Sequence, residues 1–274
     1  MTISLGELPE PAELHAWLNA RRRLDWDERI PTKAQIAGEY GVDATVRSLT
    51  LLTEAARVEQ EITEDLTASI GPDTSAYQLE SRLKSPQSLT RKIFIRTGTD
   101  FDQLPLDDVV RYTILAPEPD DLVRTAIDAC DSLADRGWEM SGAIHSYADG
   151  SRYKGLHLFL YSQAVRVEVQ VHSRESIDVK TRTTPLYVVE RDHGQPREKR
   201  TRARNEAVAL SGQMRQPAGI DDLKTLGGVP VVLRFYGRRS NQASGREEGD
   251  ASSQAQQSAA QRLAKRTSTK ERSL

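Results

Sequence analysis

The N-terminal quarter of the chain distributes apolar and polar residues with a helical period. In residues 43–70 the apolar side chains recur at three- and four-residue spacings, with Glu and Arg between them, and a Gly-Pro-Asp sequence follows. This pattern predicts one long amphipathic helix that ends at the Gly-Pro turn. Residues 12–29, which follow two prolines, predict a shorter helix, and a second segment begins at Pro31.

The middle of the chain changes to short apolar runs rich in β-branched and aromatic residues, bounded by Gly, Asp or Pro. Such runs predict strands, here at residues 109–115, 138–147, 156–161 and 165–171. Helices are predicted at residues 120–136, 173–190 and 195–214. The order of helices, then mixed strands and helices, then helices predicts one α+β domain with helical flanks.

Hydrophobic residues make up only 37% of the chain, and the deficit is local. After residue 240 the only large apolar side chains are Leu263 and Leu274. A stretch of this kind cannot bury enough apolar surface to offset the entropy lost on ordering. We therefore expect an N-terminal helical segment at residues 1–70, an α+β domain with its C-terminal helices at 71–236, and a disordered tail at 237–274.

Charge and cysteine content exclude several classes of protein. Lys and Arg number 38 against 40 Asp and Glu, and this near balance excludes a histone-like protein that coats nucleic acid. The single cysteine, Cys130, excludes an internal disulfide framework and a cysteine-based zinc site. The sequence has no apolar run of the ~18 residues that a membrane span needs and no visible secretory signal, so we expect a cytoplasmic protein without a membrane partner.

Cations and hydroxyls gather within eleven residues, from position 82 to 92. A helix that begins near the middle of this segment would place Ser88 and Lys92 on one face, beside Arg91. Arg82 and Lys84 would lie just ahead of that helix. Fixed N–H donors and mobile positive charge are what a polyphosphate needs. The segment therefore predicts a polyphosphate site, with a basic surface helix as the alternative.

Two carboxylates are associated with the predicted strands. Asp108 precedes the first strand, and Glu168 lies inside the last one, between Val167 and Val169. Side chains alternate between the faces of a strand, so Glu168 points away from the two valines. Mg2+ is usually held by one or two carboxylates together with substrate phosphates. The pair indicates a magnesium–nucleotide site, and a sheet with one polar face in water is the alternative.

A turn at residues 149–150 leads into the strand predicted at 156–161. Tyr153 and Lys154 lie on the loop between them, and His157 lies inside the strand. A tyrosine on such a loop can stack on a base, and its neighbouring cations can bind phosphate. The alternative is a turn tyrosine that packs on the rim of the sheet.

Together these groups resemble the RelA/SpoT nucleotide pyrophosphokinases, the alarmone synthetases. The family's Arg-x-Lys-x-x-x-Ser-x-x-x-Lys pattern is matched at residues 82–92, and its metal-binding Asp at a strand start is matched by Asp108. Its Tyr-(Arg/Lys)-x-x-His segment is matched at 153–157, and its Glu-(Val/Ile)-Gln strand at 168–170. Four motifs in the family's order, over roughly residues 79–190, make the resemblance specific.

The resemblance implies a nucleotidyltransferase-like mixed β-sheet flanked by helices, the fold of the family's synthetase domain. It implies an ATP-dependent transferase of the GTP diphosphokinase type, which moves pyrophosphate from ATP to the 3′-hydroxyl of GTP or GDP, makes (p)ppGpp and releases AMP. Mg2+ is the implied cofactor, held by Asp108 and Glu168, and Glu168 could also take the hydroxyl proton. Chemistry of this kind depends on positioning and charge neutralisation.

The same resemblance assigns the remaining site residues. The ATP phosphates would be bound by Arg82, Lys84, Ser88, Arg91 and Lys92, and Lys84 joins Asp108 and Glu168 as a catalytic residue. The acceptor side would be formed by Tyr153, whose ring stacks on the base, and by Lys154, His157 and Gln170.

The chain departs from the usual family pattern at several positions. Thr113 stands where the first strand normally has Arg, with Arg111 two places early, and His172 replaces the Arg after the Glu-x-Gln strand. These features resemble the small single-domain branch, which includes toxic members. Members of that branch make guanine or adenine alarmones, or pyrophosphorylate the 3′ CCA end of tRNA. Thr184 stands where that branch usually has His.

The resemblance also bears on partners. The His-Asp dipeptide of the family's hydrolase half does not occur in the sequence, so we expect synthesis without degradation. Such a protein would need control by its expression, by an antitoxin or by another regulatory chain. A homo-oligomer is also allowed. A basic run could bind a tRNA backbone, which makes tRNA the acceptor ranked second after GTP or GDP, and the favoured alternative is that the run is the solvated face of a C-terminal helix. Its residues are Arg191, Arg197, Lys199, Arg200, Arg202 and Arg204. The remaining alternatives are a non-catalytic nucleotide-binding module and another enzyme of the nucleotidyltransferase fold that transfers a nucleotidyl group.

Overall fold

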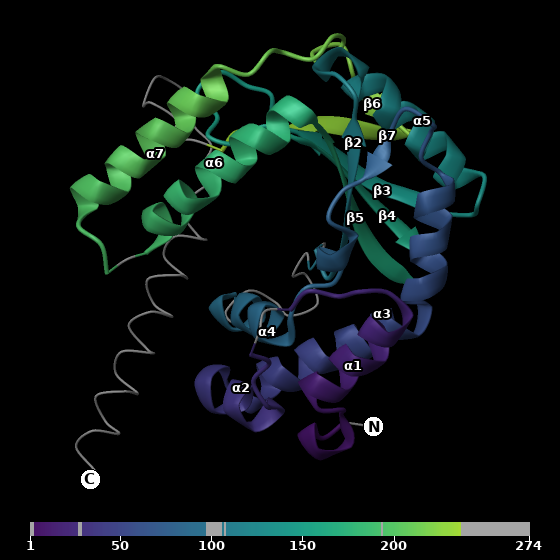
Figure 1. Cartoon of the computed structure of the whole chain (residues 1–274), viewed down its shortest axis with the longest axis vertical. Coiled ribbons are helices and arrows are strands. Elements are labelled where there is room, and N and C mark those ends of the chain that lie inside the picture. The colour runs from purple at the N-terminus through teal and green to yellow at the C-terminus, as the bar shows by residue number, and fades with distance from the viewer. Residues whose placement is uncertain (1–2, 27–28, 97–105, 107, 193, 237–274) are drawn as a thin grey trace. The chain divides into compact units, whose positions relative to one another are not determined.

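The computed structural model of the chain describes residues 3–26, 29–96, 106, 108–192 and 194–236. These residues fall into two compact units, whose elements are drawn in Figure 1. The first unit holds the described residues up to Arg57 and from Leu83 to Val109. The second holds Val58–Arg82 and the described residues from Val110 onward. The predicted disordered tail at 237–274 lies outside the described residues.

This division differs from the contiguous segments expected from the sequence, which placed a boundary at residue 70. Leu83–Val109 groups with the N-terminal helices, although the motif that it carries was assigned to the α+β domain. The other boundary falls inside one helix, after Arg57. Contacts between segments distant in the sequence decide such a division, and no local composition signal marks them.

The first unit is helical. Its elements are η1 (Leu5–Glu7), α1 (Pro11–Arg21), α2 (Lys33–Tyr40), the first part of α3 (Val42–Ala68) and α4 (Pro86–Ile95). The long helix predicted at residues 43–70 is confirmed by α3, whose apolar face includes the fully buried Leu49, Leu52 and Ile62. The helix predicted at 12–29 is shorter than expected, because Arg22 already has extended backbone angles.

The second unit is built on a seven-stranded sheet with the order β1-β2-β5-β4-β3-β7-β6. β2 is parallel to β5, whereas β4 is antiparallel to both of its neighbours, so the sheet is mixed. The four predicted strands are confirmed, and β1, β6 and β7 are additional. The strands are β1 (Ser75–Ala76), β2 (Val110–Ala116), β3 (Glu139–His145), β4 (Leu156–Ser162), β5 (Val165–Ser173), β6 (Thr225–Leu226) and β7 (Val229–Leu233).

Helices flank this sheet, so the predicted α+β class is confirmed. α5 packs on β3 and β5 through buried side chains that include Leu122, Ala126 and Leu133, and α6 and α7 lie side by side (Figure 1). The helical elements are η2 (Leu79–Ser81), η4 (Pro119–Asp121), α5 (Leu122–Ala134), α6 (Arg174–Arg191) and α7 (Arg197–Gly212). Among the described residues, no helix has the length and apolarity that a membrane crossing requires.

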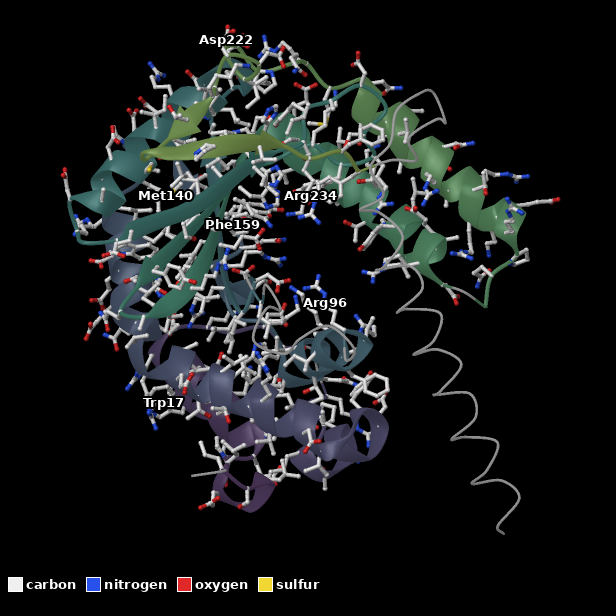
Figure 2. All side chains as sticks on the ribbon, turned by 180° about the vertical axis from the view of Figure 1, so that it is seen from behind. Trp17, Arg96, Met140, Phe159, Asp222 and Arg234 are labelled. Atoms are coloured by element: carbon white, nitrogen blue, oxygen red, sulfur yellow. The ribbon has the colours of Figure 1, made fainter. Side chains whose placement is uncertain are left out.

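The central strands have one apolar and one polar face. Val167, Val169 and Val171 of β5 are fully buried on the apolar face. On the other face Glu168 is paired in register with Arg111 of β2 and with Phe159 of β4, which is labelled in Figure 2. Glu168 is only 7% exposed. The polar face is therefore covered at Glu168, which a sheet with one face simply left in water would not require.

Candidate active site

Helix α4 begins as the basic segment predicted. Ser85 is its N-cap, and its side-chain oxygen accepts a hydrogen bond from the backbone N–H of Ser88 at 3.4 Å. Pro86 occupies the first helical position, where a missing N–H has no cost. Ser88 and Lys92 lie four residues apart on this helix, and Arg91 is exposed. The start of α4 therefore agrees with the sequence interpretation.

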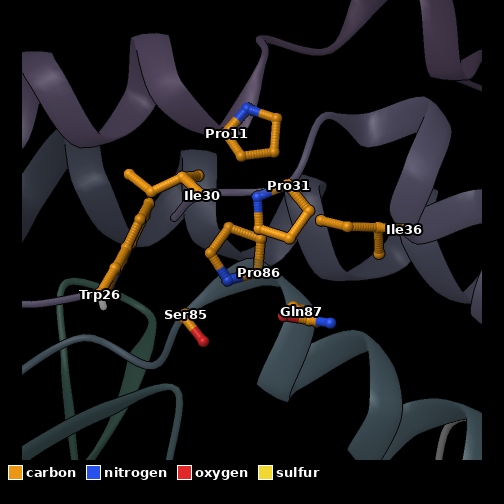
Figure 3. A pocket seen from close by; sticks show the side chains of 8 residues that line it. All are labelled: Pro11, Trp26, Ile30, Pro31, Ile36, Ser85, Pro86 and Gln87. Atoms are coloured by element: carbon orange, nitrogen blue, oxygen red, sulfur yellow. The ribbon is translucent and has the colours of Figure 1, made fainter. Parts of the chain in front are cut away.

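The start of α4 packs against the N-terminal helices through an apolar recess (Figure 3). Three prolines, Pro11, Pro31 and Pro86, line it together with Trp26 and Ile36. The indole N–H of Trp26 donates to the carbonyl of Leu83 at 2.9 Å, which fixes the chain just ahead of the helix. The described residues that line this recess are all uncharged, so the recess serves to pack α4 and offers no cation of its own to a phosphate.

Lys84 and Lys92 both end on the carboxylate of Asp108, and we call these three residues the lysine–aspartate cluster. Lys84 Nζ lies 2.6 Å from Asp108 Oδ2, and Lys92 Nζ pairs with Oδ1. The backbone N–H of Lys84 also donates to the carbonyl of Val109 at 3.0 Å. The three side chains are each about one-fifth exposed, at 19–21%. The structure thus gathers three of the predicted site residues from two separate stretches of sequence.

The charges of this cluster stabilise one another. Burial alone would raise the pKa of Asp108, but the two ammonium groups overcome that effect and hold it well below its ordinary value. Burial also lowers the pKa of Lys92, partly offset by the charge of Asp108. Asp108 therefore stays ionised far into the acid range, and both of its oxygens are engaged by cations.

Arg82, the first residue of the same motif, lies elsewhere. Its side chain is fully buried in the second unit, its Nε pairs with Glu59, and its Nη1 donates to the carbonyl of Leu79 at 3.1 Å. Glu59 also accepts from Thr63 Oγ1, which lies 2.7 Å from the hydroxyl of Tyr112. This buried network joins α3 to β2. The expectation that Arg82 holds an ATP phosphate does not agree with this position, because no ligand-accessible surface remains on its side chain.

The second group lies on the polar face of the sheet, and we call it the sheet-face cluster: Tyr153, His157, Glu168, Gln170 and His172. Glu168 Oε1 is its centre, 2.6 Å from His157 Nδ1, and it accepts from Gln170 Nε2 at 3.0 Å. Burial would raise the pKa of Glu168, but the hydrogen bond and charge of His157, with smaller effects of Gln170 and Arg111, bring it below its ordinary value. Glu168 is thus an ionised, oriented carboxylate.

Tyr153 extends the sheet-face cluster. Its hydroxyl lies 2.9 Å from His157 Nε2 and 3.1 Å from His172 Nε2. Burial raises the pKa of this hydroxyl well above 10, so it stays protonated. The ring of Tyr236 meets the Tyr153 ring edge-on at 5.6 Å, and the neighbouring Lys154 is buried. The predicted acceptor residues are therefore in one place, but both ring nitrogens of His157 are used within the protein.

The sequence interpretation missed Lys180. Its ammonium donates to Gln170 Oε1 at 3.1 Å from helix α6, which carries none of the recognised motifs. Burial, with the nearby charge of Arg111, lowers the pKa of Lys180 to about 8. The only sequence signal is indirect, since α6 follows β5 without a loop and returns a cation beside the Glu-x-Gln strand.

The carboxylates can be tested for a fit to Mg2+. Among the described residues there is no group of three or more His, Cys, Asp or Glu that could hold a metal on its own. Mg2+ commonly takes one or two carboxylates and completes its shell with water and substrate phosphates. Ionised Asp108 and Glu168 belong to that ligand class, so the chemistry of the available donors fits Mg2+ delivered with a nucleotide.

Solved structures of small alarmone synthetases are similar to this chain. The small alarmone synthetases 2 and 1 from Bacillus subtilis are 14% and 13% identical to it, with TM-scores of 0.37 and 0.36; the matches cover 60% and 59% of this chain and 90% and 86% of theirs. A GTP pyrophosphokinase family protein from Streptococcus pneumoniae is 15% identical, with a TM-score of 0.37, over 70% of this chain and 92% of that one.

No protein-family model matches the chain, and no curated protein matches it by sequence. The function is therefore argued from the side chains of the two clusters and not from these similarities.

The departures from the alarmone-synthetase pattern also have positions in the structure. Thr113 is paired in register with Gln170, so it lies beside the sheet-face cluster. Thr184 donates to the backbone carbonyl of Lys180 at 2.7 Å and is thereby used within its own helix. His172 takes part in the sheet-face cluster directly.

Proposed function

We propose that the protein is a pyrophosphokinase that transfers pyrophosphate from ATP to the 3′-hydroxyl of GTP or GDP and releases AMP. The observation that carries the proposal is the convergence of Lys84 and Lys92 on Asp108. Two flexible ammonium groups held by one ionised carboxylate are the parts that a magnesium–polyphosphate complex requires. A basic surface helix would not need to direct both lysines at one acid.

The ATP side of the proposal rests on an exchange of partners. Lys84 and Lys92 are partly exposed, so both can turn from Asp108 to the phosphates while Asp108 becomes available to Mg2+. Ser88 and Arg91 lie on the same helix and add a hydroxyl and an exposed cation. Arg82 is left out of this set because its guanidinium is buried against Glu59.

The acceptor side rests on the sheet-face cluster. Glu168 takes the proton of the acceptor 3′-hydroxyl, whose oxygen forms the new bond to the β-phosphorus of ATP as AMP leaves with the bridging oxygen. Tyr153 presents its ring to the acceptor base, and Lys154, Gln170 and Lys180 supply polar groups around it. Mg2+, which Asp108 would help to hold together with the phosphates, would neutralise the charge that develops during transfer.

Product analysis tests the proposal. The purified protein, incubated with Mg2+, β-phosphate-labelled ATP and either GTP or GDP, should release AMP and form a labelled guanosine tetra- or pentaphosphate. At the same ATP concentration, the Asp108→Asn variant should form far less of both products. Guanosine tetraphosphate supplied to the protein should stay intact, since synthesis without degradation is proposed. Release of ADP or of free pyrophosphate without label in the acceptor would contradict the assignment.

Helix α7 favours one second candidate, a tRNA 3′ end as the acceptor. Arg197, Lys199 and Arg202 are exposed on it, whereas Arg200 and Arg204 bind Glu190 through 2.8 and 2.7 Å hydrogen bonds. Three exposed cations can bind a phosphate backbone. Deacylated tRNA added to the labelled reaction distinguishes the two, since label in tRNA alone would replace the guanine nucleotide as acceptor. An antitoxin, another regulatory chain and a homo-oligomer stay predictions.

A further inference from the structure

The hydroxyl of Tyr153 is held between two imidazole rings that come from different strands. His157 of β4 approaches it at 2.9 Å and His172 of β5 at 3.1 Å, each through its Nε2 atom. Both rings also meet the tyrosine ring edge-on, with centroids 5.6 and 5.9 Å away. The position of the tyrosine is therefore fixed on two sides by contacts to the sheet.

The single proton of the Tyr153 hydroxyl limits the hydrogen bonds that it can make with the two histidines. A phenol has one proton, so it can donate to only one of the two nitrogens and must accept from the other. Burial lowers the pKa of His172 well below 6.5, which keeps that ring neutral with one donor and one acceptor. Its Nδ1 lies 2.9 Å from the hydroxyl of Ser176 in the first turn of α6. His172 thus links the tyrosine to the junction of β5 and α6.

Gly155 shows how tightly the backbone packs on this arrangement. A Cβ atom at that position would lie 2.7 Å from the Tyr153 hydroxyl, 3.0 Å from His172 Cε1 and 3.1 Å from His157 Nε2. Its φ angle is not positive, so glycine is needed for close approach and not for backbone conformation. Three side chains and one backbone position are therefore fitted to the same point.

His157 connects this point to the carboxylate. Its Nδ1 atom lies 2.6 Å from Glu168, so the chain of contacts runs from His172 through Tyr153 and His157 to Glu168. A tyrosine that only packed on the rim of the sheet would not need its hydroxyl tied to an ionised acid. These contacts thus connect Tyr153, the ring assigned to the acceptor base, to Glu168, the carboxylate assigned to the proton of the acceptor 3′-hydroxyl.

We propose that His172 is a positioning residue for the acceptor, acting through Tyr153: with His157 it clamps the tyrosine hydroxyl and so fixes the stacking ring relative to Glu168. The inference rests on the proposed function, since it assigns Tyr153 to the acceptor side. It predicts that loss of the clamp weakens acceptor binding and leaves ATP binding unchanged, because the proposed function assigns ATP to the lysine–aspartate cluster and the acceptor to the sheet-face cluster.

Steady-state kinetics of two His172 variants test this role. His172→Ala removes the hydrogen bond and should raise the acceptor KM about ten-fold, the effect of one lost hydrogen bond of ordinary to high strength, while the ATP KM stays within about two-fold. His172→Gln can still reach the tyrosine hydroxyl and should recover most of the loss. His145→Ala, which removes another buried histidine of the same unit, is the control and should leave both KM values unchanged.

Two results would overturn the role of His172: equal changes in both KM values, or a Gln variant as impaired as the Ala variant. Tyr153→Phe, which keeps the ring, supplies a readout independent of turnover. In 15N spectra of the imidazole rings it should shift the signals of His157 and His172 and leave those of His15 and His145 in place. Unchanged His172 signals would show that the clamp does not form, whereas shifted signals from a protein that modifies no acceptor would count against the proposed function alone.

Discussion

The two polar clusters of this molecule differ in how firmly their charges are held. In the lysine–aspartate cluster, Lys84, Lys92 and Asp108 are each about one-fifth exposed, and the two cations share one acid. In the sheet-face cluster, Glu168 is nearly buried, and its partners are held in turn by further hydrogen bonds. The first cluster can exchange its partners for a ligand, whereas the second is already organised around one carboxylate.

This contrast matches the two tasks of a group transfer. A polyphosphate brings its own charge and metal, so its site needs mobile cations that can leave one anion for another. The hydroxyl of an acceptor brings neither charge nor metal. Its site therefore needs a carboxylate that is fixed in place before the substrate binds. Changes to the first cluster should therefore act mainly on the KM for ATP, and changes to the second mainly on kcat and on the acceptor.

The largest effect is expected from Glu168→Gln. This change keeps the size of the side chain and one acceptor oxygen, but it removes the base, and kcat should fall by about a thousand-fold. The KM for ATP should change little, because the proposed function assigns ATP to the lysine–aspartate cluster. Rates of AMP release with saturating substrates measure both values. Glu139→Gln, at an exposed carboxylate of β3, is the matched control, and near-normal turnover by Glu168→Gln would contradict the assignment.

A stability measurement separates the lysine–aspartate cluster from the buried arginine of the same motif. Arg82→Met leaves the charge of Glu59 buried without its partner, and the free energy of unfolding should fall by about 3–5 kcal/mol. Replacing both residues, as in Arg82→Met with Glu59→Met, should recover much of that loss. Urea unfolding followed by circular dichroism measures the change. A stable Arg82→Met protein with a raised KM for ATP would instead return Arg82 to the phosphate site.

Arg82 also illustrates what the sequence could and could not predict. The start of α4 at Ser85 follows from a capping serine and a proline, which are local signals, and the polar side of β5 follows from strict alternation. The partner of Arg82 is Glu59, on a helix 23 residues earlier, and nothing in the motif indicates it. The spacing of the family motif therefore assigned the buried Arg82 to the same phosphate site as the partly exposed Lys84 and Lys92.

Four of the five residues of the sheet-face cluster were named from the sequence, His172 was noted only as a departure from the family pattern, and the geometry of the cluster was not predicted. Tyr153, His157, Glu168 and Gln170 were all named, yet their mutual hydrogen bonds depend on the register between β4 and β5, which is a long-range property. Lys180 reaches the cluster because α6 turns back on β5, and no spacing rule relates it to Gln170. Local patterns thus identified elements and candidate residues, whereas pairing in space decided which of them meet.

Within the lysine–aspartate cluster, Lys92→Met should raise the KM for ATP by about ten- to a hundred-fold, the usual loss for a charge-assisted hydrogen bond. Its effect on the acceptor KM should be small. Lys33→Met is the control, because Lys33 is similarly exposed and pairs with Glu10 at 3.8 Å in the same unit but carries no part of the motif. If Lys92→Met weakened ATP and acceptor binding equally, the contrast between the clusters would fail.

The smallest effect concerns pH and Lys180. Its pKa is lowered to about 8 because burial disfavours the charged form, so its positive charge beside Gln170 is lost as the pH rises through about 8. The effect on stability has the opposite direction. An unfolded chain keeps this proton up to about pH 10.4, so the free energy of unfolding increases as the pH rises above 8. The acceptor KM of the wild type should increase about two- to five-fold between pH 7 and 9, because the neutral amine can still donate to Gln170 and only the extra strength of a charged donor is lost. Lys180→Met should be weaker throughout and free of that increase, and an identical pH profile in the variant would remove Lys180 from the acceptor side.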